Sequence, residues 1–119
     1  MSTPAGPFPA TNSHTRSRPG SPVLRWSARA RADLKAIHDY IAKDSPLNAK
    51  AVAREILARV ATLPETPRVG RIVPELSNSD IRELSVHSWR VIYQLRDADL
   101  YVLTLVHKRR APGPEDLRG

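Results

Sequence analysis

The 119-residue chain contains no cysteine, which excludes disulfide bonds, thiolate zinc sites and cysteine nucleophiles. Aromatic residues are scarce: two tryptophans, three tyrosines and one phenylalanine. No apolar run approaches the roughly 18 residues needed to cross a bilayer, so we expect no membrane span. Glycine-rich phosphate loops and Asp/His clusters suited to a divalent metal are also absent. We therefore expect one small domain without cofactor or metal and, because nothing argues for export, a cytoplasmic protein.

Positive charge is what the chain has in excess. It carries 19 Lys and Arg against 12 Asp and Glu, a formal net charge of +7. Such a balance favours polyanionic partners, such as nucleic acid, a nucleoprotein particle or an acidic protein segment. The sign of the charge alone does not choose among them.

Residues 1–22 differ in composition from the rest of the chain. Fourteen of these 22 residues are Ser, Thr, Pro or Gly, and the stretch holds five of the eleven prolines. This composition cannot offset the entropy lost on ordering, so it predicts a disordered tail. The stretch also lacks the apolar core of a secretory signal. An alternative hypothesis is that translation starts near Val23 or Leu24 and that the tail is a start-site artefact.

Two amphipathic helices are predicted in the first half of the chain. Ser27 provides an N-cap for the first helix, which ends near Asp44. Ser45 and Pro46 begin the second helix, which ends at Pro64. Apolar residues recur with helical spacing at Ala30, Leu34, Ile37 and Ile41, and again at Ala49, Val52, Ala53, Ile56, Leu57, Val60 and Leu63. Because few residues join the two helices, they form an antiparallel hairpin.

After the second helix the period of the apolar pattern switches to two, which is typical of strands. We expect strands at residues 23–26, 81–86, 90–96 and 100–107, with short loops at 87–89 and 97–99 and a linker at 64–74. Apolar residues on both faces indicate a sheet that is covered on each side. The fold class is therefore α+β: a helical hairpin packed on a small antiparallel sheet, in the order β-α-α-β-β-β over residues 23–110. Residues 111–119 are expected to form a loose tail.

Several short blocks in this order match a known pattern. They read Arg-Ala-Asp-Leu-Lys-Ala-Ile-His-Asp-Tyr-Ile at 31–41, Val-Pro-Glu-Leu at 73–76, Ile-Arg-Glu-Leu at 81–84, Trp-Arg-Val-Ile-Tyr at 89–93 and Val-His-Lys-Arg-Arg at 106–110. Together with the order of the elements, they resemble the RelE/ParE superfamily of type II toxin–antitoxin toxins, on the ParE side. The resemblance covers residues 23–110.

The resemblance implies a growth-arresting toxin, of the kind used in plasmid stabilization, that inhibits DNA gyrase without catalysis of its own. In that mechanism gyrase breaks the DNA and the toxin traps the break. It also implies neutralisation by a cognate antitoxin, whose acidic, partly disordered C-terminal half folds along the helical hairpin and the sheet edge. Operator DNA would be reached only through the antitoxin. Residues 23–119 hold 17 basic and 12 acidic side chains, which suits an acidic partner.

Two alternatives stay open. RelE-like relatives are ribosome-dependent mRNA endoribonucleases, and here His107 could act as the general base while Arg90 and Arg110 bind phosphate. However, residues 108–119 contain no Tyr or His, a departure from the RelE pattern. The other alternative is a non-toxic remnant that still binds its antitoxin.

Candidate contacts with the target or antitoxin are Arg82, Trp89, Arg90, Lys108, Arg109 and Arg110. Arg82 and Glu83 are strand neighbours and leave opposite faces, so each can instead form a salt bridge with a different element. Trp89 is either an exposed anchor for a partner or packed against the helices. The basic run at 108–110 is either a solvated tail or a contact with an acidic partner or DNA. Tyr93 and Tyr101 are interpreted as core residues.

Overall fold

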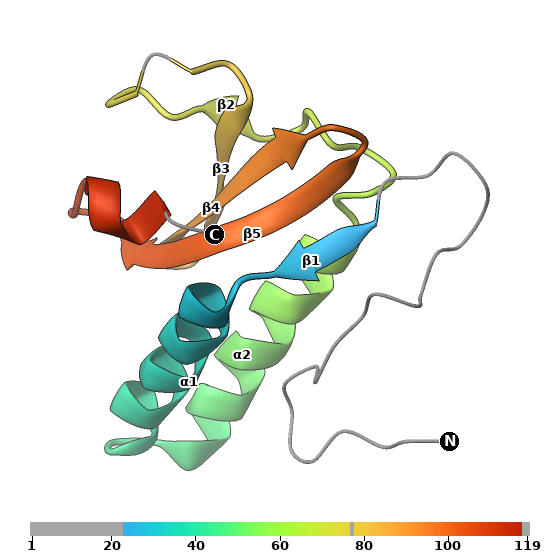
Figure 1. Cartoon of the computed structure of the whole chain (residues 1–119). Helices are drawn as coiled ribbons and strands as arrows, with labels where there is room; N and C mark the ends of the chain where they lie inside the picture. Colours follow the sequence, from blue (N-terminus) through green and yellow to red (C-terminus); the bar gives the residue numbers. More distant parts are fainter. Residues whose placement is uncertain (1–22, 77, 118–119) are drawn as a thin grey trace.

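The computed structural model describes residues 23–76 and 78–117, so the tail predicted at residues 1–22 lies outside the described part. Strand β1 (Leu24–Trp26) leads into helices α1 (Ala28–Ala42) and α2 (Pro46–Ala61). Strands β2 (Arg71–Ile72), β3 (Ile81–Val86), β4 (Trp89–Arg96) and β5 (Asp99–His107) follow, and the 3-10 helix η1 (Pro114–Leu117) ends the described chain. Figure 1 shows both helices on the same side of the sheet. The predicted α+β fold is confirmed.

Both helices begin at the predicted serine caps. The Ser27 hydroxyl accepts a hydrogen bond from the backbone N–H of Ala30 at 3.0 Å, and Ser45 accepts one from Asn48 at 3.1 Å. Each bond satisfies one of the N–H groups that a helix start leaves without an intrahelical partner. The Ser27 hydroxyl also donates to the carbonyl of Leu103 at 2.8 Å. The start of α1 is therefore fixed to strand β5.

The sheet has the strand order β1-β5-β4-β3-β2 and is mixed. β3, β4 and β5 pair antiparallel through two hairpins, whereas β1 pairs parallel with β5. The prediction of an antiparallel sheet is wrong for this one pairing. A hairpin forces antiparallel strands, but β1 and β5 are separated by both helices and three strands, so no tight turn sets their direction.

Two local differences concern the loops. β2 lies in the predicted linker and pairs antiparallel with β3. Its two residues are too few to give an alternating pattern. The hairpin loops contain two residues rather than three, because Trp89 and Asp99 already belong to strands. His87 and Asp97, the first residue of each loop, have φ of 55° and 56°, the left-handed backbone that a tight turn requires.

The sheet is covered on both faces, as predicted. The larger core cluster lies between the helices and the sheet and is built on residues such as Leu34, Ile56 and Val91. A smaller cluster of Val73, Ile81, Ile92 and Val106 covers the opposite face. We call these the helix side and the outer face. No helix in the described part of the chain is long and apolar enough to cross a membrane.

Tyr93 is a fully buried core residue, as predicted. Its hydroxyl donates to the carbonyl of Pro67 and accepts from the backbone N–H of Gly70, both at 2.9 Å. Burial raises the pKa of this phenol above its ordinary value of 10.0. Tyr101 is only half-buried, and the guanidinium of Arg96 lies 4.6 Å from its ring centre. The core prediction therefore holds fully only for Tyr93.

Candidate functional site

Arg90 is the centre of an ion-pair network on the outer face of the sheet. Its Nε donates to Glu83 Oε1 at 2.7 Å, and its two terminal nitrogens donate to the carboxylate of Glu75 at 3.1 and 2.7 Å. One of them also donates to the carbonyl of Arg110 at 2.9 Å. The side chain of Arg90 is 7% exposed and that of Glu83 only 2%. The guanidinium is therefore enclosed by acceptors and screened from solvent.

The network changes the acidity of its members. The hydrogen bond from Arg90 holds the pKa of Glu75 below its ordinary value near 4.5. The reciprocal hydrogen bond from Glu75 raises the pKa of Arg90 above its already high value. Both groups stay charged at neutral pH and hold the loop after β2 against β4.

Arg82 and Glu83 leave opposite faces of β3, as predicted, but only Glu83 forms ion pairs. Glu83 pairs with Arg71 as well as with Arg90. Arg82 instead donates to the carbonyl of Gly70 at 2.9 Å, and its Nε has no hydrogen-bond partner among the described residues. The expectation of a salt bridge from each residue therefore fails for Arg82. The neighbouring loop presents carbonyl oxygens to it in place of a carboxylate.

The segment after β5 is anchored rather than loose over residues 111–117. Asp116 is fully buried and accepts hydrogen bonds from Arg29, from Arg110 at 3.0 Å and from the backbone N–H of Gly113 at 2.8 Å. Leu117 packs on the outer cluster. The prediction of a loose tail is wrong here because one aspartate joins the segment to α1, a long-range contact that local composition does not reveal.

The basic run at residues 108–110 divides into two groups. Arg110 is paired with Asp116, whereas Lys108 and Arg109 are exposed and have no carboxylate partner within the described part of the chain. Two cations therefore remain at the end of β5 for contact with a partner.

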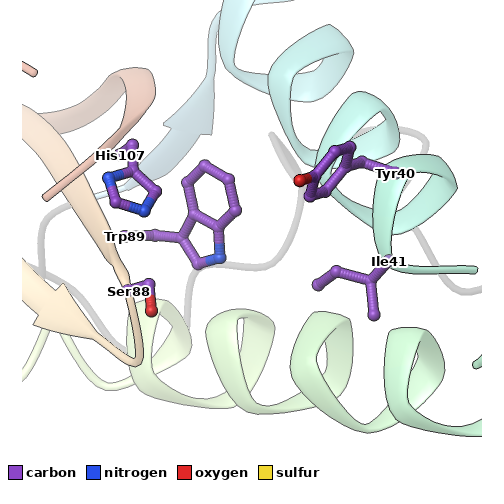
Figure 2. Close-up of a pocket in the computed structure, with 5 residues that line it drawn as sticks. All are labelled: Tyr40, Ile41, Ser88, Trp89 and His107. Atoms are coloured by element: carbon purple, nitrogen blue, oxygen red, sulfur yellow. The ribbon is translucent and has the colours of Figure 1, made fainter. Parts of the chain in front are cut away.

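Trp89 and His107 line a pocket on the helix side. The two residues are register partners across β4 and β5, and their rings meet edge to face with centres 5.3 Å apart. Figure 2 shows them opposite Tyr40 and Ile41 of α1, with Ser88 beside them. Trp89 is half-buried and packs against the helix-side core while one part of it faces the pocket. The packing against the helices is therefore observed, and contact with a partner stays a prediction.

The three residues of the ribonuclease hypothesis do not meet in one site. His107 pairs with Trp89, and Trp89 is the strand neighbour of Arg90. Side chains alternate along a strand, so His107 and Arg90 leave opposite faces of the sheet. Arg110 is directed to Asp116. The pairing of β4 with β5 brings the backbones of Arg90 and His107 close together, but the pleat directs their side chains to opposite faces.

Sequence reasoning missed Glu75, Asp116 and Tyr40 as parts of these arrangements. Glu75 and Asp116 lie in segments without periodicity, and each finds its arginine only through the tertiary fold. Tyr40 is exposed on α1, and its position opposite Trp89 depends on how α1 crosses the sheet. No group of three or more potential ligands in residues 23–76 and 78–117 is arranged to hold a metal ion.

Three comparisons with known proteins relate the chain to a toxin family, to a relative and to a solved structure. The sequence pattern of the family described as ParE toxin of type II toxin–antitoxin system, parDE, matches residues 24–112. The chain is 37% identical over 86 residues to Toxin RelE2 of Caulobacter vibrioides, an alignment that covers 71% of this chain and 93% of that protein. A solved structure described as a chromosomal ParDE system from P. aeruginosa matches with a TM-score of 0.63 and 22% identity, covering 74% of this chain and 97% of the other. The structural match supports the fold.

Proposed function

Because the chain belongs to the ParE family of type II toxin–antitoxin toxins, we propose that it inhibits DNA gyrase without catalysis and is neutralised by a cognate acidic antitoxin. The separation of His107 from Arg90 supports the absence of catalysis in this proposal. A ribonuclease that cleaves through a 2′-hydroxyl must hold a general base and cationic groups around one phosphate. Here the base and the buried guanidinium lie on opposite faces of the sheet.

The ion pairs that Arg90 and Arg110 form within the chain support the same conclusion. Arg90 donates to two carboxylates, and Arg110 is paired with the buried Asp116. A phosphate would have to displace these carboxylates before it could bind either guanidinium. The exposed Lys108 and Arg109 remain available, and they suit a binding surface rather than a catalytic centre.

The proposal is tested with the purified full-length chain in two parallel assays. One follows DNA supercoiling and cleavage-complex formation by gyrase, and the other follows mRNA cleavage on translating ribosomes. We expect inhibition in the first and no cleavage in the second. His107→Ala should leave inhibition unchanged, because no reaction step requires its imidazole.

Charge reversal separates the binding surface from general electrostatics. We expect Lys108→Glu/Arg109→Glu to weaken gyrase inhibition at least tenfold, the loss typical of residues that dominate an interface. The matched control is Lys50→Glu/Arg54→Glu, the same charge change on the exposed face of α2. Ribosome-dependent cleavage that is abolished by His107→Ala would refute the proposal and replace it with the ribonuclease function.

A further inference from the structure

The pocket between α1 and the β3–β4 hairpin has the chemistry of a peptide-anchor site. Its volume is about 380 Å³, and Tyr40, Ile41, Ser88, Trp89 and His107 line it. That volume lies near the lower end of the roughly 300–1,000 Å³ typical of ligand pockets. With aromatic walls on two sides, the pocket suits one large apolar side chain.

The polar groups at the pocket can all donate hydrogen bonds. Figure 2 shows the Tyr40 hydroxyl directed toward Trp89, across the opening. Within the described part of the chain, neither this hydroxyl, nor that of Ser88, nor the indole N–H of Trp89 has a protein partner. His107 Nδ1 accepts from the backbone N–H of Arg109 at 3.2 Å, which leaves the proton of the neutral imidazole on Nε2. A ligand rich in acceptors, such as carboxylates and backbone carbonyls, complements this set.

The rim of the pocket is positively charged. Lys43 lies 6.0 Å from the ring centre of Tyr40, and Lys108 and Arg109 follow His107 directly. None of these three cations is paired with a carboxylate among the described residues. Exposed carboxylates also lie near this rim, but Asp39 is paired with Lys35 and Glu55 with His87. Asp44 therefore faces three cations without carboxylate partners, and the net charge of the rim stays positive. An acidic segment is therefore favoured over a neutral or basic one.

We propose that this pocket binds a large apolar side chain from an acidic segment of the antitoxin. The apolar side chain lies between the rings of Tyr40 and Trp89, and flanking carboxylates meet Lys43, Lys108 and Arg109. Tyr40 supports this assignment, because 67% of its surface is exposed although it is a large aromatic residue beside an apolar pocket. The inference rests on the proposed neutralisation by an antitoxin and specifies where the partner is anchored.

The test measures binding of the full chain to its cognate antitoxin by isothermal titration calorimetry. Tyr40→Ala should raise Kd about tenfold and Trp89→Ala about thirtyfold, since buried aromatic anchors dominate interfaces. Tyr40 is exposed, so its truncation leaves the core intact and keeps the test valid even if Trp89→Ala unfolds. Val69→Ala, an exposed apolar residue outside the pocket, should stay within about twofold of the wild type.

Each outcome is decisive. A wild-type chain that binds no antitoxin overturns both the proposed neutralisation and the pocket assignment. Tight binding by the wild type that is unchanged in Tyr40→Ala overturns the pocket alone. An equal loss in Val69→Ala and Tyr40→Ala also overturns it, because the binding energy would then be spread over the whole surface. The inference is supported if Tyr40→Ala and Trp89→Ala weaken antitoxin binding while Val69→Ala does not. Lys108→Glu should then weaken binding most at low salt.

Discussion

Replacement of Arg90 by methionine should destabilise the fold by about 3 kcal/mol. The change removes the guanidinium from a network in which Glu83 is 2% exposed and Arg90 itself 7% exposed. Removal of one partner of a buried ion pair costs roughly 3–5 kcal/mol, because a charge stays buried without its partner. We expect the lower end of this range because Arg71 still pairs with Glu83. The loss of the pair with Glu75 adds little to this cost, because the Glu75 side chain is 38% exposed and water solvates it.

The assay is equilibrium unfolding in urea at neutral pH, followed by circular dichroism. Arg54→Met is the matched control, because Arg54 is exposed on α2 and should change stability by less than about 0.5 kcal/mol. The double variant Arg90→Met/Glu83→Leu should recover at least half of the loss, since it also removes the orphaned carboxylate. A loss below about 1 kcal/mol for Arg90→Met, or a double variant less stable than the single one, would refute the reasoning.

The pH dependence provides an independent check. Arg90 lowers the pKa of Glu75 in the folded state, so this interaction stabilises the fold above about pH 4.5. The stabilisation is lost as the pH falls through the lower folded-state pKa. The Arg90→Met variant lacks this contribution. The difference in the free energy of unfolding between the wild type and the variant should therefore narrow as the pH is lowered below about 4.5. A difference that widens in acid would contradict the assignment.

Two further predictions concern the loop before β2 and the C-terminal segment. A Cβ at Gly70 would lie 2.5 Å from the carbonyl oxygen of Glu83 and 2.6 Å from the Tyr93 hydroxyl, so Gly70→Ala should cost about 1–3 kcal/mol. The thermal midpoint measures this loss, and an unchanged midpoint would contradict it. Asp116→Ala removes an acceptor from two arginines and a backbone N–H, so amide exchange at residues 113 and 115–117 should accelerate. Unchanged exchange there would show that Asp116 does not anchor the segment.

The sequence predicted those elements whose signal is local. The serine caps and the helical spacing of apolar residues set both helices, and alternation set β3 to β5. β2 was missed because two residues give no period, and the direction of β1 was missed because nothing local sets it. The C-terminal segment was misjudged because its order depends on Asp116 reaching Arg29, 87 residues earlier in the chain.

The candidate site was predictable as a set of residues but not as an arrangement. Trp89, Arg90 and His107 stand out as chemistry-bearing residues at one end of two strands. Which residues face one another follows from the register, and the register depends on where the hairpin loops end. With the predicted loop at 87–89, Trp89 lies outside the strand, whereas the observed two-residue loop makes it the register partner of His107.

The buried network also specifies that register. Glu83 and Arg90 lie on the outer face, where Glu75 and Arg71 approach them from the loop and from β2. A slip of β3 by one residue would turn Glu83 toward the apolar helix side, without a cationic partner, and would turn Leu84 outward. Because a buried unpaired carboxylate costs several kcal/mol, the slipped pairing is strongly disfavoured. Trp89 lies opposite His107 through the separate pairing of β4 with β5, whereas the ion pairs on the outer face secure the pairing of β3 with β4. Both pairings are needed to bring Ser88, Trp89 and His107 together at the pocket on the helix side.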